Sequence, residues 1–273
     1  MYASGSLRSF IPAVLPRTFN TDGTGGYPGV VQYGTGCDFD SDPLYNGCTV
    51  VSSPTNPQLI SSKNWQVNSS RTTTDFYDFF YRRFNAPTTA TITAPFDNLT
   101  AVTKPSSNCT ATSCSPYYVV GDMTTSASGW TVGATDKIVI LVNGNLTIGG
   151  NITITPGGFL AFIVNGNISV SPAIGRTSTG TQPNIMGIYI ATKADHSATF
   201  STGASSTTDG TIVRFVGKGM FVADNFLLQR DLQSFGVTNT GASAELFIYD
   251  PQLLLTMPES MKDLAITWQE IAP

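Results

Sequence analysis

The clearest hydrophobic pattern in the chain is a run that occurs twice. Residues 138–148 read IVILVNGNLTI, and residues 160–170 read LAFIVNGNISV, 22 residues further on. Short apolar runs separated by Asn-Gly corners, repeated at a fixed period of this length, are typical of a solenoid. The alternative is an antiparallel hairpin built on Asn-Gly, but a hairpin does not explain the second copy.

Within each copy, alternate residues form a candidate core, because successive side chains of a strand point to opposite faces. Three short strands fit into one copy, at residues 138–142, 146–148 and 152–155. The pattern therefore predicts an all-β fold: a parallel (right-handed) β-helix in which each copy forms one turn, or rung.

Stacked rungs place residues 22 apart directly above one another, about 4.8 Å away. Asn143 then meets Asn165, and Asn145 meets Asn167. Such stacked amides can bond from rung to rung. The Asn-Gly pairs also suit corners because both residue types tolerate positive φ.

The outward positions of the repeat are apolar as well: Val139, Leu141, Ala161 and Ile163. A strand that is apolar on both faces is normally covered on both sides. The cover is predicted to be the N-terminal segment, an aromatic helix or another subunit, which makes this face a candidate assembly or packing surface.

Residues 72–84 are the one convincing helix, with Thr74 as the predicted N-cap and Arg82-Arg83 at the C-terminal end. The helix carries an aromatic stripe, made of Phe76, Phe79, Phe80 and Phe84. We expect it to cap an open end of the β-helix, which solenoids need covered. A sugar-stacking platform that includes Tyr77 and Tyr81 is the alternative.

The chain divides into an extended N-terminal arm with a disulfide loop, residues 1–58, and a β-helix domain, residues 59–273. The arm lacks periodic apolar runs, so it is predicted either to lie on its own solenoid or to exchange strands with another subunit. Later strands are expected at 188–190 and, 25 residues on, at 213–215. A terminal strand at 264–271 is expected to cover the last rung.

Composition narrows the class of protein. Of the 273 residues only 12% are charged, and the net charge is −4. A nucleic-acid surface needs clustered Lys and Arg, so no nucleic-acid partner is expected. No stretch has the length of a transmembrane helix, and residues 1–10 lack the charged and apolar regions of a signal peptide. Thr, Ser, Asn and Gly between the apolar runs favour an extracellular or cell-surface β protein.

Four cysteines form two local pairs, Cys37 with Cys48 and Cys109 with Cys114. Their even number and close spacing predict two disulfide-closed loops in an oxidising compartment. Zinc is the alternative, but neither pair has knuckle spacing and the chain holds a single histidine.

The loop between Cys37 and Cys48 contains a candidate calcium site, made of Asp38, Asp40, Asp42 and Asn46. Several hard oxygens from one short segment suit Ca²⁺. The sequence departs from the EF-hand loop, and a solvated acidic turn is the competing interpretation. Calcium is the one candidate cofactor.

Catalytic chemistry is not expected. The single histidine, His196, lies in a polar stretch and is predicted to be a surface residue. The nearest acid and base group lies outside the repeat and is predicted to be a surface ion-pair group: Arg214, Lys218, Asp224, Arg230 and Asp231. Six N-x-S/T sequons, at Asn68, Asn98, Asn108, Asn145, Asn151 and Asn167, fall on a background rich in Asn and Thr.

Four stretches carry a resemblance: residues 75–83, the VNGN rungs, residues 247–255 and the terminal WQEIAP of 268–273. In these the chain resembles uncharacterised secreted β-solenoid surface proteins of candidate-phylum bacteria. Its rungs are also similar to those of polymer-forming bactofilins, although bactofilins lack its disulfide pairs, aromatic helix and long arms. The resemblance implies appendage material and no catalytic residues.

From these observations we expect a non-enzymatic structural protein, a subunit of a surface filament, appendage or layer built by contacts with copies of itself. A carbohydrate-binding or adhesive protein that recognises surface glycans is the first alternative. A polysaccharide lyase or hydrolase on a β-helix is the second.

Overall fold

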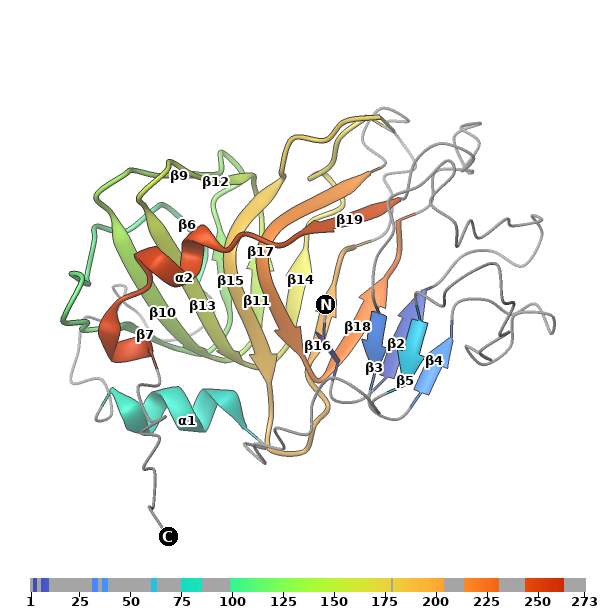
Figure 1. The fold of residues 1–273 in the computed structure, drawn as a ribbon, viewed down its shortest axis with the longest axis horizontal. Coiled ribbons are helices and arrows are strands. Elements are labelled where there is room, and N and C mark those ends of the chain that lie inside the picture. The colour runs from blue at the N-terminus through green and yellow to red at the C-terminus, as the bar shows by residue number, and fades with distance from the viewer. Residues whose placement is uncertain are drawn as a thin grey trace, which may run out of the picture.

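A computed structural model shows a parallel β-helix whose strands stack into two main sheets (Figure 1). The structure describes residues 2–3, 6–9, 31–33, 36–38, 60–62, 75–84, 99–177, 179–203, 214–230 and 244–262. In Figure 1 the stack runs from β7 and β10 on the left to β4 and β5 on the right. All named strand pairs are parallel, which confirms the predicted fold class.

Sheet A is the larger sheet. Its main path holds, in spatial order, β7 (Tyr117–Val120), β10 (Lys137–Asn143), β13 (Phe159–Asn165), β15 (Ile185–Thr192), β17 (Phe215–Ala223), β1 (Tyr2–Ala3), β3 (Val31–Tyr33) and β5 (Ile60–Ser62). Three strands join this sheet off the path: β9 (Trp130–Val132), β12 (Ile152–Ile154) and β19 (Glu245–Ile248).

Sheet B forms the opposite wall of the stack. It holds, in the same spatial direction, β6 (Leu99–Val102), β8 (Met123–Thr125), β11 (Leu146–Ile148), β14 (Ile168–Val170), β16 (Thr199–Ser201), β18 (Asn225–Leu228), β2 (Ser6–Ser9) and β4 (Gly36–Asp38). The described helices are α1 (Phe76–Arg83), α2 (Gln252–Thr256) and a 3₁₀ turn, η2 (Glu259–Met261).

The repeat sets the register as predicted. Ile138 pairs with Leu160 and Val142 with Val164, and Leu146 pairs with Ile168 on the other wall. The inward residues of both copies are fully buried. An aromatic column rises through this core, in which the rings of Trp130, Phe162, Tyr189 and Phe221 lie 5.3–5.8 Å apart from one to the next.

Glycine serves the corners differently from the prediction. Gly144 and Gly166 do not have positive φ. A Cβ atom on Gly166 would lie 2.2 Å from the carbonyl oxygen of Gly144, and one on Gly144 would lie 2.3 Å from the same atom of Gly121. Glycine is therefore required at these corners because stacked backbones approach closely, not because of the φ angle.

One predicted register is wrong. Ile188 pairs with Met220, 32 residues later, and not with the stretch at 213–215. Phe215 instead begins β17, whose Gly217 pairs with Ile185 at the start of β15. The insertion after β16 lengthens this rung, so the 22-residue spacing no longer holds.

The rung beyond β17 and β18 is built from both ends of the chain. β19 pairs with residues 215–218 of β17, whereas β1 pairs with residues 222–223 of the same strand. β2 pairs with β18, and β3, β4 and β5 extend the stack further. The strands of the predicted arm are thus rungs, and β5 carries them past the predicted boundary at residue 58. The predicted terminal strand, 264–271, lies outside the described residues.

Candidate functional site

The apolar outer face of sheet A is covered by the chain itself. Val139, Leu141, Ala161 and Ile163 have no exposed surface. They form a second hydrophobic cluster with residues from three covering segments: α1, the loop closed by Cys109 and Cys114, and the segment that carries α2 and η2. Of the covers predicted for this face, the structure therefore uses the aromatic helix, together with two segments that the sequence did not indicate.

Helix α1 exists but lies along the flank of the stack, below sheet A in Figure 1, and not across its end. It packs on β13 and β15, because the outward side chains of those strands form an apolar face that the helix covers. Its N-cap is Asp75 and not Thr74: the Asp75 carboxylate accepts hydrogen bonds from the backbone N–H groups of Tyr77 and Asp78.

The aromatic stripe of α1 divides between packing and the helix surface. Phe76, Phe80 and Phe84 pack against the outer cluster. Phe79 instead meets the ring of Phe80 edge-on and lies beneath the guanidinium of Arg83.

The two tyrosines of the predicted sugar platform are packing residues. Tyr77 is buried, and its burial raises the pKa of its hydroxyl well above the ordinary value. The ring of Tyr81 lies 5.7 Å from the ring of Tyr118 in β7.

The second cysteine pair forms a disulfide, as predicted, between Cys109 and Cys114. Next to it, the side chain of Asn108 imitates a backbone pairing with β10: it donates to the carbonyl of Val139 and accepts from the N–H of the same residue. The loop in turn holds the C-terminal segment, since the carbonyl of Ala111 accepts from the N–H of Glu259.

We call residues 249–262 the strap, because they run back over sheet A from β19 towards β10 (Figure 1). Leu253 and Met261 are the buried anchors of the strap. Lys137 of β10 donates to the carbonyl of Thr256, and Arg83 of α1 donates to the carbonyls of Ser260 and Lys262. α1 and the strap therefore hold each other on the outer face.

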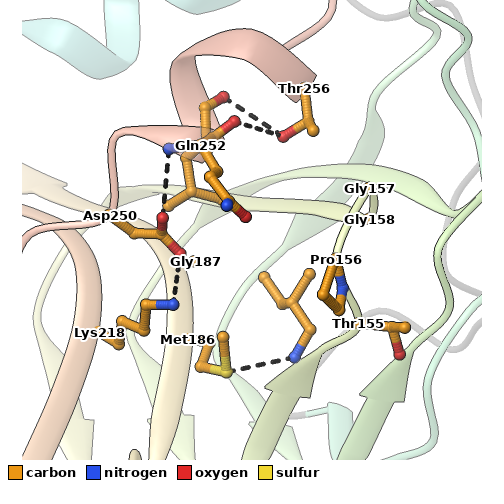
Figure 2. A pocket seen from close by; sticks show the side chains of 12 residues that line it. Thr155, Pro156, Gly157, Gly158, Met186, Gly187, Lys218, Asp250, Gln252 and Thr256 are labelled. Carbon is orange, nitrogen blue, oxygen red and sulfur yellow. Dashed lines mark hydrogen bonds and ion pairs between the residues drawn. The ribbon is translucent and has the colours of Figure 1, made fainter.

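A small pocket lies where the strap leaves β17 (Figure 2). The ammonium of Lys218 is 3.1 Å from the carboxylate of Asp250, and that carboxylate also accepts from the N–H of Gln252. The floor consists of the turn at residues 155–158 with Met186 and Gly187. The lysine and aspartate neutralise each other here and attach the strap to β17.

The charged residues predicted as a surface ion-pair group are separated and largely buried. Arg230 donates to the carbonyl oxygens of Thr202, Ser171 and Pro172. Its burial lowers the pKa of the guanidinium to about 10, although nearby Glu245 opposes the shift, so the group stays cationic at neutral pH. Arg214 is buried and donates to the carbonyl of Gly180. Asp231 lies outside the described residues.

Asp224 organises the corner between β15 and β16. Its buried carboxylate accepts from the backbone N–H groups of Lys193 and Ala198. His196, whose side chain is 46% exposed, places Nδ1 3.4 Å from the same carboxylate. The histidine is thus a surface residue, as predicted, and Asp224 acts on the backbone of the turn.

The asparagine columns link the rungs in two ways. Asn165 donates from its side-chain amide to that of Asn143, as predicted. In the second column the Asn145 side chain accepts instead from the backbone N–H of Asn167, whose side chain accepts from the N–H of Thr199. With Asn108 and Asn151 also hydrogen-bonded through their side chains, four of the sequons serve the stack. Asn68 and Asn98 lie outside the described residues.

The calcium loop cannot be placed. Asp38 is the last residue of β4, and Asp40, Asp42, Asn46 and Cys48 lie outside the described residues. The backbone of Cys37 pairs in register with Leu7. Within the described ranges there is no group of three or more metal-binding side chains and no helix long and apolar enough to span a membrane.

The chain belongs to a protein family. The model of a domain of unknown function, DUF7305, matches residues 52–213, more than half of the chain. This match runs from β5 through α1 and the repeat to the insertion after β16. Neither the curated proteins nor the solved structures contain a match to the chain.

Sequence reasoning missed two features. The strap escaped because its exposed apolar residues, Tyr249, Leu254 and Leu255, resemble a strand more than a short helix. The N-terminal strands β1, β2, β4 and β5 escaped because they are two to four residues long, too short for a periodic signal. The apolar spacing of residues 253–261 is the signal that points to the strap.

Proposed function

We propose that this protein is a structural subunit of an extracellular filament, appendage or layer, built by strand contacts between copies. The observation that carries the proposal is the continuous parallel stack, in which eight strands of sheet A follow one another from β7 to β5. A stack of this kind ends in strand edges, and such edges are templates for pairing with another chain.

The use of the polar side chains supports a structural role. Three polar side chains form hydrogen bonds with backbone groups: those of Asn108, Asp224 and Arg230. Lys218 and Asp250 pair with each other. These groups hold turns and covering segments in place, as a structural subunit requires.

The disulfide and the composition support a location outside the cell. A disulfide such as that between Cys109 and Cys114 is expected in an oxidising compartment. The low share of charged residues, 12%, and the resemblance to secreted β-solenoid surface proteins favour the same location. With its outer face covered by α1 and the strap, the stack offers its ends for assembly.

Electron microscopy combined with light scattering tests the proposal. Purified protein is concentrated stepwise in oxidising buffer, and we expect scattering mass to rise with concentration and filaments or a lattice to appear on grids. A monomer of constant mass at the highest concentration, with empty grids, would remove the proposed function.

A further inference from the structure

The strand order of both sheets is a cyclic permutation of the order in the sequence. Sheet A runs β7, β10, β13, β15, β17, β1, β3, β5, so the earliest strands follow the latest main-path strand. Sheet B repeats the arrangement, running β6, β8, β11, β14, β16, β18, β2, β4. The displaced block is the same in both sheets: the strands from β1 to β5.

The two blocks advance in the same direction. The chain passes outward from β1 through β3 to β5, and it passes the same way from β7 through β10 to β17. Within one molecule it must therefore return from β5 to β7, across seven strand spacings, or about 34 Å. In the sequence α1 lies between β5 and β7, and it is the part of this link that the structure describes.

The junction between the blocks is a strand edge with a matched register. Tyr2 and Ala3 pair with Val222 and Ala223, and Leu7 pairs with Phe226. In backbone register, Leu7 follows Ile168, Phe200 and Phe226, and Cys37 follows Leu7. The strands β2 and β4 thus continue the parallel register of sheet B.

The pairings that join β1–β5 to the remaining described strands are those of β1 with β17 and of β2 with β18. Every one of them is an edge contact between parallel strands. A second copy presents the same edge and the same strands. Exchange of an identical element between protomers therefore keeps these pairings and changes the path of the linking chain.

We infer that β1 and β2 of one copy pair with β17 and β18 of a second copy, an inference that rests on the proposed structural role. In that arrangement spatial order equals sequence order, since β5 is followed by β7 of its own chain and no return across the stack is needed. Each copy donates at one end and accepts at the other. Such a head-to-tail contact does not close, so it builds a filament.

The exchanged filament keeps the strand pairings of the closed monomer and adds the contact of β5 with β7, the two end strands of sheet A in the monomer. The balance between monomer and filament is set by the effective concentration of the tethered block against the concentration of free copies. Dilute protein is therefore expected to hold its own N-terminal strands, and concentrated protein to exchange them.

A pair of introduced cysteines can show whether β2 pairs with β18 of its own chain or of a second copy. Arg8 and Leu227 are register partners on neighbouring strands. Residues paired in this way have Cα atoms about 5 Å apart, within the range that a disulfide bridges. The double variant Arg8→Cys/Leu227→Cys is folded at increasing concentration, oxidised and run on non-reducing gels, with the linked peptides identified by mass spectrometry. We expect a ladder of covalent dimers, trimers and longer species that grows with concentration.

Arg8→Cys/Ser169→Cys is the matched control. Ser169 lies in the same column as Leu227 but two strands further into the stack, out of disulfide reach of residue 8. It is expected to remain a monomer without the added link. Both double variants change residues within paired strands, so their folding is checked first. Circular dichroism measures the β content, and mass spectrometry of the peptide linked by Cys109 and Cys114 tests for the native disulfide.

A double variant that links residues 8 and 227 only within one chain at every concentration overturns the exchange, as does a variant that never links them. The proposed function is judged separately on wild-type protein. Filaments on grids combined with intrachain links alone would reject the exchange and leave the structural role. Interchain links in a protein whose mass stops at a closed dimer would support the exchange and reject the filament.

Discussion

The middle rungs of this β-helix and the rung of β1, β2 and β19 are built in different ways; the latter is called the end rung here, although β3, β4 and β5 stack beyond it. In the middle, β10 and β13 come from two copies of one run, and chain neighbours are also spatial neighbours. At the end, β17 meets β19 along its first half and β1 along its second, from opposite ends of the chain. The middle is therefore specified locally, whereas the end is specified by an edge that any matching strand can fill.

The difference indicates that the middle rungs supply most of the stability of this solenoid, whereas the end rung can exchange its pairing partners during assembly. The middle rungs carry the aromatic column inside and the covered face outside. The end rung depends on short strands: β1 forms two residue pairs with β17, and β2 forms three with β18. Substitutions in the two regions should consequently affect different properties.

The largest expected effect is in the middle. Phe162→Ala removes a fully buried ring that contacts Trp130 and Tyr189, and it should lower the free energy of unfolding by about 3–5 kcal/mol. Chemical denaturation measures this. Ser169→Ala, an exposed position on a neighbouring strand, is the control and should change stability by less than about 0.5 kcal/mol. Equal effects of the two substitutions would refute the assigned core.

A proline at the end rung should separate the two regions. Leu7→Pro removes the backbone N–H of a residue in β2, which pairs with β18 and β4, and should release β1 and β2, since proline cannot donate to a strand ladder. Hydrogen exchange is expected to lose protection in residues 222–228 and to keep it in residues 138–170. The same variant should lose concentration-dependent assembly. Uniform loss of protection along the stack would show that the end is not an independent region. Arg8→Ala, at the neighbouring position, is the control.

The asparagine columns should contribute a smaller amount. Asn165→Ala removes the 2.8 Å hydrogen bond to the Asn143 side chain at a partly exposed corner and should cost about 0.5–1.5 kcal/mol. Thermal or chemical unfolding measures it. Ser169→Ala, the exposed control already described, provides the comparison. No difference between the two would mean that the column contributes shape and not stability.

The smallest effect is a pH dependence at the turn before β10. The hydrogen bond from Lys104, with a second from the N–H of Gly133, holds the pKa of Asp136 below its ordinary value. The folded state thus binds this proton less readily than the unfolded state, so the contribution is present at neutral pH and is lost as the pH falls from about 4 through the folded pKa. Asp136→Asn should flatten the acid limb of stability against pH. An unchanged acid limb would contradict this assignment.

The sequence predicted the middle of the molecule well because the repeat carries its register twice. Residues 138–148 and 160–170 fixed the strands, the inward residues and the need for an outer cover. The second disulfide followed from the close spacing of Cys109 and Cys114, and the existence of α1 from its aromatic stripe. The helix is shorter than predicted and begins at an Asp75 cap, since the local signal of Thr74 and Asp75 was ambiguous.

The positions of the N-terminal strands and of the strap could not be predicted from the sequence, because these segments contact residues that are distant in the chain. Nothing near Tyr2 or Leu7 indicates pairing with residues more than 200 positions away. The strap holds α1 through backbone carbonyls, which carry no residue signature. Arg230 and Asp224 likewise bind backbone groups, so their charges suggested an ion-pair group when their actual role is to fix turns.

The most direct test of the structural role is the axial repeat of the assembled protein, measured by fibre diffraction or helical electron microscopy. The account predicts strands perpendicular to the filament axis, a meridional spacing of about 4.8 Å, and a rise of about 38 Å per subunit from the eight strands of the sheet A path. A filament without the strand spacing along its axis, or a protein that stays monomeric at every concentration, would contradict it.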